Sequence, residues 1–248
     1  MRTIILAAGL GSRLRDICGD RPKPLFEMRG KSLLEHSLHS LAQTGIREST
    51  IVIGYNGEMI QKKIGQEFEG VKIDYADNPD YATTGSMHSV YCALKLKKPE
   101  DCLILDGDLV FNPRLTTQLR EDYRKDLALL VNCCGNGDET FTILDNDGKI
   151  SYMKLNKKVD ITSIRTREDV YEFNGISKFS KEFISEMVKF IDGEMRKGAN
   201  DLYYEECALQ VSKKIPWYGL VGDGRMLVEI DRKEDVARAE KVLDRMSS

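Results

Sequence analysis

The chain has 248 residues, of which 41% are hydrophobic and 31% charged, with a formal net charge of −3 at pH 7. This composition is typical of a folded globular protein and excludes a disordered chain, while the small net charge disfavours a general nucleic-acid or membrane-surface binder. No apolar run approaches the roughly 20 residues that span a bilayer. We therefore expect a cytoplasmic protein with no nucleic-acid and no membrane partner.

Apolar runs alternate with helical patterns through the first half of the chain. The pattern predicts strands at 3–6, 50–53, 71–75, 102–105 and 127–132, and helices at 33–43, 59–67 and 86–96. Such alternation predicts an α/β fold of the Rossmann-like kind, with a mostly parallel mixed sheet and helices on both faces.

The second half of the chain has a different pattern. Residues 141–153 predict a hairpin around the turn Asp145-Asn146-Asp147-Gly148. Further strands are expected at 170–179 and 227–230, and helices at 181–194 and 233–246. No linker rich in Pro, Gly or Ser divides the chain, so residues 1–248 are interpreted as a single domain with a small lid-like elaboration.

A glycine-containing turn follows the first predicted strand. Gly9 and Gly11 allow the backbone to approach a phosphate closely, and the Arg13 guanidinium can donate paired hydrogen bonds to it. Leu14 occupies the third glycine position of G-x-G-x-x-G, which disfavours a dinucleotide-binding fold, and the ending of a Walker A motif is absent. The turn is therefore a candidate phosphate loop of another kind.

About ten residues further on, the chain reads Arg21-Pro22-Lys23-Pro24-Leu25. The two prolines restrict the backbone and fix the direction of Lys23. An ammonium held in this way suits the charge that develops on a phosphate, so Lys23 is a candidate catalytic residue.

Together, L-A-A-G-L-G-S-R-L and R-P-K-P-L resemble the signature of the nucleotidyltransferase superfamily that includes sugar-phosphate nucleotidylyltransferases and cytidylyltransferases of small alcohol phosphates. The resemblance implies a fold of the nucleotide-diphospho-sugar transferase type. It also implies a nucleotide site, with Lys23 at the α-phosphate. The implied nucleotide-binding residues are Leu6, Ala7, Ala8, Gly9, Gly11, Ser12, Arg13 and Lys23.

Asp106-Gly107-Asp108 ends an apolar strand, which places carboxylates at the edge of the sheet where the glycine turn also ends. Oxygen ligands of this kind suit Mg²⁺. The resemblance implies that Asp108 and the late Asp231 are the two magnesium-binding aspartates. It leaves Asp106 a supporting role.

Two further segments are candidates for substrate contacts. Gly85 and Ser86 in Thr84-Gly85-Ser86-Met87 precede a helix, where Ser86 is also suited to an N-cap. In the superfamily this segment borders the nucleobase, and its form resembles phosphonate and phosphocholine cytidylyltransferases.

Tyr204 and Glu205 are candidate acceptor-binding residues, because an aromatic ring and a carboxylate suit a cationic amine. An ordinary helix N-terminus with acidic residues explains the same pattern. Lys154 is the candidate contact for the acceptor phosphate, and Lys157 and Lys158 are alternative candidates.

Together with this resemblance, these residues predict transfer of a nucleoside monophosphate from an NTP, with CTP preferred, to an amine-bearing phosphate or phosphonate. Mg²⁺, Lys23 and Arg13 would neutralise charge, and no side chain is assigned as a general base. A sugar- or polyol-1-phosphate nucleotidylyltransferase is the alternative, and a non-catalytic nucleotide-binding module is a second one. The oligomeric state stays open, a homodimer included.

Overall fold

A computed structural model describes residues 1–132, 140–155 and 169–247. Its centre is a set of parallel strands in the order β7-β1-β4-β6. These strands are Cys102–Asp106 (β7), Arg2–Leu6 (β1), Glu48–Ile53 (β4) and Val71–Asp77 (β6). β7, β1 and β4 are mostly buried, as expected for parallel strands covered on both faces, whereas β6 also carries exposed polar residues.

The sheet continues beyond β7 through strand β12 (Val170–Phe179), which runs antiparallel to it. Strand β12 also pairs with β9 (Leu127–Asn132) and β10 (Thr140–Leu144). The register on the β9 side shifts between Phe173 and Ser177. On its other edge β12 pairs with β10 at residues 170–173 and with β7 at residues 176–179. Between these stretches Gly175 has a positive φ of 69°, which bends β12 next to the end of β7.

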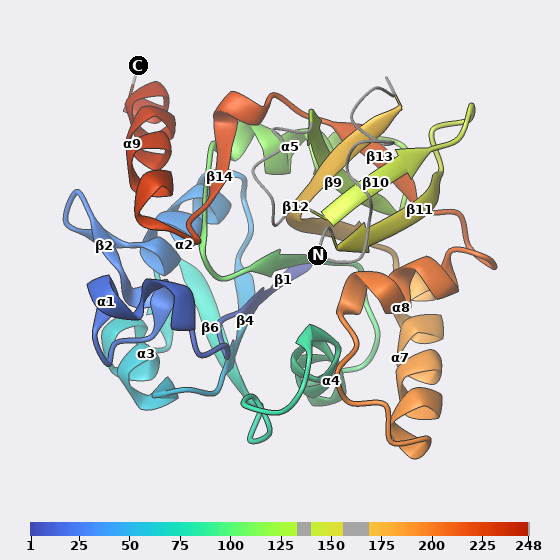
Figure 1. Cartoon of the computed structure of the whole chain (residues 1–248), viewed down its shortest axis with the longest axis horizontal. Coiled ribbons are helices and arrows are strands. Elements are labelled where there is room, and N and C mark those ends of the chain that lie inside the picture. The colour runs from blue at the N-terminus through green and yellow to red at the C-terminus, as the bar shows by residue number, and fades with distance from the viewer. Residues whose placement is uncertain (133–139, 156–168, 248) are drawn as a thin grey trace.

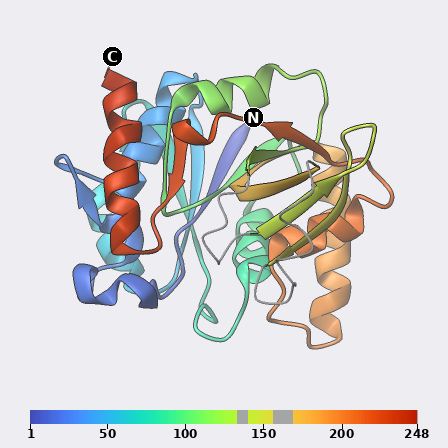
Figure 2. The same ribbon diagram turned by 45° about the horizontal axis from the view of Figure 1, so that its top comes forward.

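Helices cover both faces of the sheet (Figures 1 and 2). On one face, α4 (Ser86–Leu96), α7 (Lys181–Arg196) and α8 (Tyr204–Val211) pack into one hydrophobic core. On the other face, α2, α3 and α5 form a second core, and α9 joins a smaller third core. These helices are Leu33–Gln43 (α2), Gly57–Ile64 (α3), Pro113–Glu121 (α5) and Lys233–Ser247 (α9). The predicted α/β fold with a mixed sheet is confirmed.

The remaining elements are short. The strands are Glu27–Met28 (β2), Lys31–Ser32 (β3), Glu67–Phe68 (β5), Leu109–Phe111 (β8), Ile150–Leu155 (β11), Tyr218–Val221 (β13) and Leu227–Glu229 (β14). The helical turns are Ser12–Leu14 (η1), Arg15–Cys18 (α1), Lys23–Leu25 (η2) and Gly224–Met226 (η4).

Several predicted boundaries agree with the structure at both ends, namely those of α2, α4, β9 and β12. The helix predicted at 59–67 is instead shifted towards the N-terminus. It ends at Ile64 because Gly65 adopts a positive φ of 74° at the C-cap, and the chain then turns into β5. The predicted hairpin is present as the antiparallel pair of β10 and β11.

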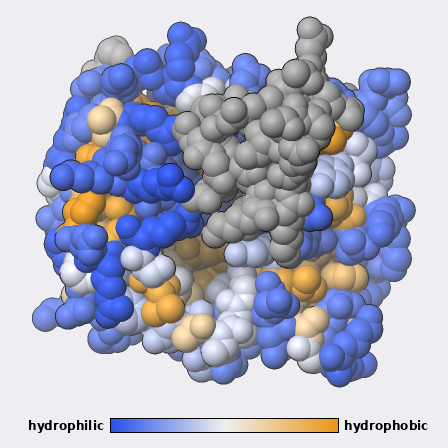
Figure 3. Space-filling model, viewed as in Figure 1, coloured by the Kyte–Doolittle hydropathy of each residue, from blue (hydrophilic) through white to orange (hydrophobic). Residues whose placement is uncertain are grey.

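The surface is mostly hydrophilic, as expected from the 31% of charged residues in the chain. Hydrophilic residues predominate on the face shown in Figure 3, and hydrophobic residues gather there only in small groups. Within residues 1–132, 140–155 and 169–247, no helix combines the length and the apolar character that crossing a membrane requires.

Candidate active site

The glycine turn and the Asp106–Asp108 segment lie side by side because their strands are paired in register. Leu6 at the end of β1 is opposite Asp106 at the end of β7. A Cβ on Gly107 would lie 2.5 Å from the Leu6 carbonyl oxygen, so this approach requires glycine. The parallel order of β1 and β7 therefore brings the predicted phosphate loop and the predicted carboxylates to one edge.

Lys23 packs directly against the glycine turn. Gly11 has a φ of 57°, and a Cβ there would lie 2.7 Å from the Lys23 Cβ. Gly11 thus serves two needs, a left-handed backbone and room for Lys23. The short helical turn η2, with Pro24 in its first turn, presents Lys23 towards the end of the sheet.

The Lys23 ammonium lies between two carboxylates. Its Nζ is 2.6 Å from Asp108 Oδ2 and 2.6 Å from Asp231 Oδ1, and its side chain is only 10% exposed. Burial on its own would lower the pKa of Lys23, but the Asp108 and Asp231 charges raise the pKa above its ordinary value. Arg13 Nη1 lies 2.8 Å from Asp231 Oδ2. Lys23, Arg13, Asp108 and Asp231, predicted as one site, are therefore together.

A two-stranded ladder outside the main sheet brings Asp108 and Asp231 close. Asp108 immediately precedes β8, and Asp231 follows β14 by two residues. In the ladder Leu109 is opposite Glu229, and the Ile230 N–H donates to the Asp108 carbonyl at 3.1 Å. The antiparallel pairing thus places the start of one strand beside the end of the other.

Glu229 is a third carboxylate of this site that sequence reasoning missed. One oxygen atom from each of Asp108, Glu229 and Asp231 lies within 4.8 Å of the other two. Burial raises the pKa of Glu229, and the charges of Asp108 and Asp231 raise it further. The alternation in Glu229-Ile230-Asp231 was a usable signal, because residues two apart in an extended segment point to the same side.

These three carboxylates fit a divalent cation. Asp108 Oδ1 is buried and has no hydrogen-bond partner among the described residues, which leaves a lone pair for a ligand. Hard oxygen donors are what Mg²⁺ takes in proteins, usually one or two carboxylates together with waters and substrate phosphates. The candidate magnesium ligands are therefore Asp108, Asp231 and Glu229.

A cavity of about 200 Å³ opens in front of this cluster. It is lined by Leu6, Ala7, Gly9, Gly11, Ser12, Arg13, Lys23, Pro24, Gly107, Asp108 and Asp231. Most of the predicted nucleotide-binding residues are therefore gathered around one space. Ala8 is instead buried, and its carbonyl accepts a hydrogen bond from the Tyr55 N–H at 3.1 Å.

Gly85 and Ser86 do not line that cavity; they are docked against the segment before α8. The Ser86 hydroxyl accepts a hydrogen bond from the Tyr204 N–H at 2.9 Å, and the Gly85 N–H donates to the Asn200 carbonyl at 2.8 Å. A Cβ on Gly85 would lie 2.2 Å from the Leu202 carbonyl oxygen. The predicted nucleobase segment and the predicted acceptor segment are thus in direct contact.

Tyr204 differs from its predicted place in an open aromatic cage. It is only 1% exposed, and its ring packs edge-on against Phe173 with 6.3 Å between the ring centroids. Its ring therefore offers no open face to a cation, because α8 turns it into the core beside α4 and α7. The structure therefore contradicts the predicted cation–π contact between the Tyr204 ring and a cationic acceptor.

Glu205 lies half-buried at the start of α8, and burial raises its pKa to about 7. The Glu205 charge in turn acts on Asp106, whose pKa is raised first by burial and then by Asp108 and Glu205. Asp106 faces the bend of β12, where a Cβ on Gly175 would lie 2.1 Å from its Oδ2. Asp106, which also feels the charge of Lys23, is therefore held towards its protonated form beside the cluster, and it interacts electrostatically with Glu205.

Lys154 lies in β11 opposite Phe141. Its neighbour Met153 belongs to the same core as Tyr204, so strand alternation points Lys154 to the other face of β11. The structure does not bring Lys154 together with Tyr204. Lys157 and Lys158 lie outside the described residues.

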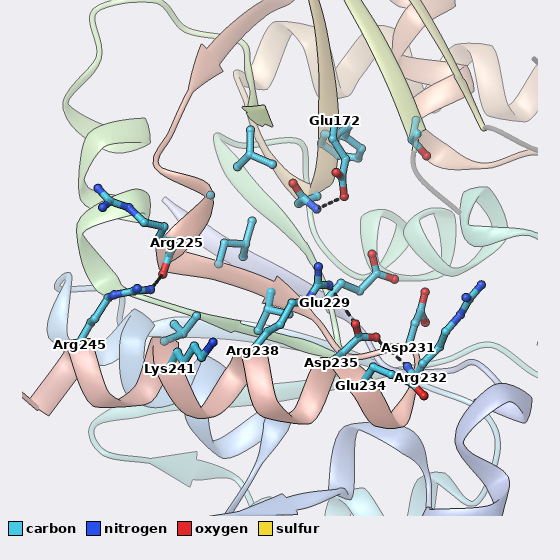
Figure 4. Close-up of a pocket in the computed structure, with 18 residues that line it drawn as sticks. Glu172, Arg225, Glu229, Asp231, Arg232, Glu234, Asp235, Arg238, Lys241 and Arg245 are labelled. Atoms are coloured by element: carbon cyan, nitrogen blue, oxygen red, sulfur yellow. Dashed lines mark hydrogen bonds and ion pairs between the residues drawn. The ribbon is translucent and has the colours of Figure 1, made fainter. Parts of the chain in front are cut away.

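A second cavity, of about 630 Å³, is drawn in Figure 4. Asp231 lines both cavities. Basic side chains line it from α9, the residue before it and η4, and acidic side chains line it from β12, from β14 and the turn after it, and from the start of α9 (Figure 4). The basic residues are Arg225, Arg232, Arg238, Lys241 and Arg245, and the acidic residues are Glu172, Glu229, Asp231, Glu234 and Asp235. None of the predicted acceptor residues is among them.

This fold and the comparisons with known proteins define a nucleotidyltransferase of the cytidylyltransferase or sugar-phosphate type. Within that class, the chain belongs to the family of the MobA-like NTP transferase domain, whose model matches residues 3–165.

The chain matches one relative over nearly its full length and another over only a small part of that relative's length. The chain is 26% identical to a choline-phosphate cytidylyltransferase of Streptococcus pneumoniae over 98% of both chains. It is 40% identical to a CMP-5'-(3-aminopropyl)phosphonate synthase of Streptomyces rubellomurinus over 48% of this chain, and that match spans only 19% of the relative. The solved structure of a CTP:phosphocholine cytidylyltransferase from Streptococcus pneumoniae shares the fold, with a TM-score of 0.73 at 24% identity over 98% of each chain.

Proposed function

We propose that this protein transfers CMP from CTP to a small phosphate or phosphonate that carries an amine, with release of pyrophosphate and with Mg²⁺ as cofactor. The observation that carries the proposal is the Lys23 ammonium held between Asp108 and Asp231 beside the glycine turn. A cation and two carboxylates that line a cavity of about 200 Å³ suit phosphoryl chemistry, in which positioning and charge neutralisation supply the catalysis.

In the proposed reaction, an oxygen of the acceptor phosphate or phosphonate attacks the α-phosphorus of CTP. A new P–O bond forms to CMP, and the bond to the leaving pyrophosphate breaks. No side chain has to remove a proton, because the acceptor oxygen is already ionised near neutral pH. The two cations, Lys23 and Arg13, would bind phosphate oxygens and offset the charge that accumulates on them.

Asp108, Asp231 and Glu229 would hold Mg²⁺ in this scheme. The metal ion, when bound, supplies Lewis-acid stabilisation of phosphate charge. Gly9 and Gly11 would direct backbone N–H groups towards the triphosphate, as glycine turns after a first strand do in other nucleotide-binding folds.

Two kinds of observation support an acceptor that carries an amine. Burial raises the pKa of Asp106 and of Glu205, and a cationic group bound beside them would favour their ionised forms. The two relatives named above act on choline phosphate or form an aminopropylphosphonate conjugate, as their names state.

The acceptor class is tested by kcat/KM with CTP and Mg²⁺ for phosphocholine, 2-aminoethylphosphonate, inositol-1-phosphate and glucose-1-phosphate. We expect pyrophosphate release with the two amine-bearing acceptors and at least tenfold lower kcat/KM with the others. Preference for a sugar or polyol phosphate would overturn the amine assignment while leaving the nucleotidyltransferase reaction in place.

A further inference from the structure

The turn between β14 and α9 is closed by a carboxylate of the helix that follows it. Asp235 Oδ2 accepts hydrogen bonds from the Asp231 N–H at 2.9 Å and from the Arg232 N–H at 2.8 Å. Asp235 is the third residue of α9, a position from which an acidic side chain can reach back to free N–H groups at the helix start. Figure 4 shows Asp235 beside Asp231 at this end of α9.

The Asp235 carboxylate is held at its other oxygen as well. Arg238 Nη2 donates to Asp235 Oδ1 at 2.9 Å from one turn further along α9. Asp235 is 14% exposed, whereas Arg238 is 46% exposed and forms the outer layer of the arrangement. Both oxygens of Asp235 are therefore engaged, and its orientation is fixed.

The chain is held at two successive residues here, Ile230 and Asp231. On one side, the Ile230 N–H bonds to the Asp108 carbonyl at 3.1 Å. On the other side, the Asp231 N–H bonds to Asp235. The Asp231 side chain extends from this anchored segment to Lys23 and Arg13, at 2.6 Å and 2.8 Å.

We propose that Asp235 is a positioning residue for the metal and phosphate site: it holds the Asp231 carboxylate at the distance from Asp108 and Glu229 that a divalent cation requires. This inference rests on the proposed function. Asp235 itself acts only through the backbone of Asp231. A residue that orients a ligand in this way typically changes metal affinity by 10- to 100-fold when it is removed.

The test compares Asp235→Ala, Asp235→Asn and Asp244→Asn. Asp244 is a matched control, because it is an exposed aspartate of the same helix that pairs with Arg29 instead of the site. Mn²⁺ affinity is measured by electron paramagnetic resonance in the presence of CTP without acceptor, and Tm is measured beside it.

We expect Asp235→Ala to weaken Mn²⁺ binding by about 10-fold or more. Asp235→Asn keeps an oxygen that accepts the same N–H groups and should recover most of the affinity. Arg238→Ala removes only the outer, exposed partner, so a smaller loss of roughly two- to fivefold is expected. The Asp244→Asn control should match the wild type.

A lower Tm for Asp235→Ala with Mn²⁺ affinity within threefold of the wild type would reduce Asp235 to a helix cap and overturn the proposal. If Asp235→Ala does not fold, Arg238→Ala decides, and an Mn²⁺ affinity of Arg238→Ala equal to that of the wild type would also overturn the proposal. A wild-type protein that binds CTP but no Mn²⁺ would instead refute the metal site of the proposed function.

Discussion

The Lys23 ammonium lies 2.6 Å from the Asp108 carboxylate, although 85 positions separate the two residues in the chain. The contact joins the motif after β1 to the motif after β7, and Asp231 adds a second carboxylate to the same nitrogen at 2.6 Å. The ammonium and the carboxylates that surround it are the centre of the proposed mechanism.

Replacing Lys23 by methionine keeps the length of the side chain and removes its charge. We expect kcat to fall by about 100-fold or more, since the loss of one preorganised charge contact to the transition state typically has this size. Lys189→Met, on an exposed lysine of α7, is the control. A kcat of Lys23→Met within about threefold of the wild type would show that the lysine does not act on the reacting phosphate.

Asp108→Asn tests the carboxylate cluster. It removes one of the three carboxylates that lie within 4.8 Å of one another, so we expect both kcat and the rise in Tm on adding Mg²⁺ with CTP to be lost. Asp147→Asn in the β10–β11 turn, whose aspartate is 71% exposed, should leave both unchanged. An Asp108→Asn protein that Mg²⁺ still stabilises fully would place the metal elsewhere.

Glu205→Gln tests the acceptor side through pH. Since burial raises the pKa of Glu205 to about 7, the folded protein holds this proton more tightly than the unfolded chain, whose carboxyl titrates near its ordinary value. The penalty for ionised Glu205 therefore develops as the pH rises from about 4.5 to 7.

Glu205→Gln should accordingly have a higher Tm than the wild type at pH 8, and the difference should shrink towards pH 5. The KM of the wild type for an amine-bearing acceptor should rise as the pH falls below about 7, and the KM of Glu205→Gln should lose this dependence. Glu182→Gln, on the first turn of α7, is the control. Parallel pH profiles for the wild type and Glu205→Gln would refute contact between Glu205 and the amine.

Gly85→Ala tests the contact between the nucleobase segment and the start of α8. Its Cβ would lie 2.2 Å from the Leu202 carbonyl oxygen, so the two segments would have to separate. We expect a loss of about 2 kcal/mol in the free energy of unfolding and a higher KM for both substrates.

The matched control is Gly193→Ala in α7. A Cβ on Gly193 meets no atom within 4 Å, so alanine should stabilise the helix by about 0.5–1 kcal/mol. Equal unfolding free energies for Gly85→Ala and Gly193→Ala would contradict the tight docking of the two segments.

Much of the architecture follows from local patterns. The apolar faces of α2 and α4, together with the residues that flank each helix, were sufficient to predict where both helices begin and end. The edge shared by the glycine turn and Asp106 follows from parallel pairing, because the carboxyl ends of β1 and β7 lie together. By contrast, β8 has three residues, too few for a periodic signal, and without β8 the ladder that gathers Glu229 was not foreseen.

The misplacement of Tyr204 has a different cause. Tyr204, Cys207, Ala208 and Val211 are spaced as one face of a helix, and all four are buried in the structure. That periodicity was present in the sequence and indicated a core position, whereas the adjacent acidic residues suggested a cage. The role of Asp235 was beyond sequence reasoning, because it depends on backbone N–H groups that only the folded turn directs at one oxygen.

The most direct test of the proposed reaction is to mix the protein with CTP and phosphocholine or 2-aminoethylphosphonate, with Mg²⁺ or with a chelator in excess, and to measure pyrophosphate and the CMP conjugate together. We expect equal molar amounts of both products with Mg²⁺ and neither with the chelator. If the protein binds CTP tightly but releases no pyrophosphate from any NTP with these acceptors or with sugar and polyol phosphates, the proposed reaction is contradicted, and the protein binds nucleotide without chemistry.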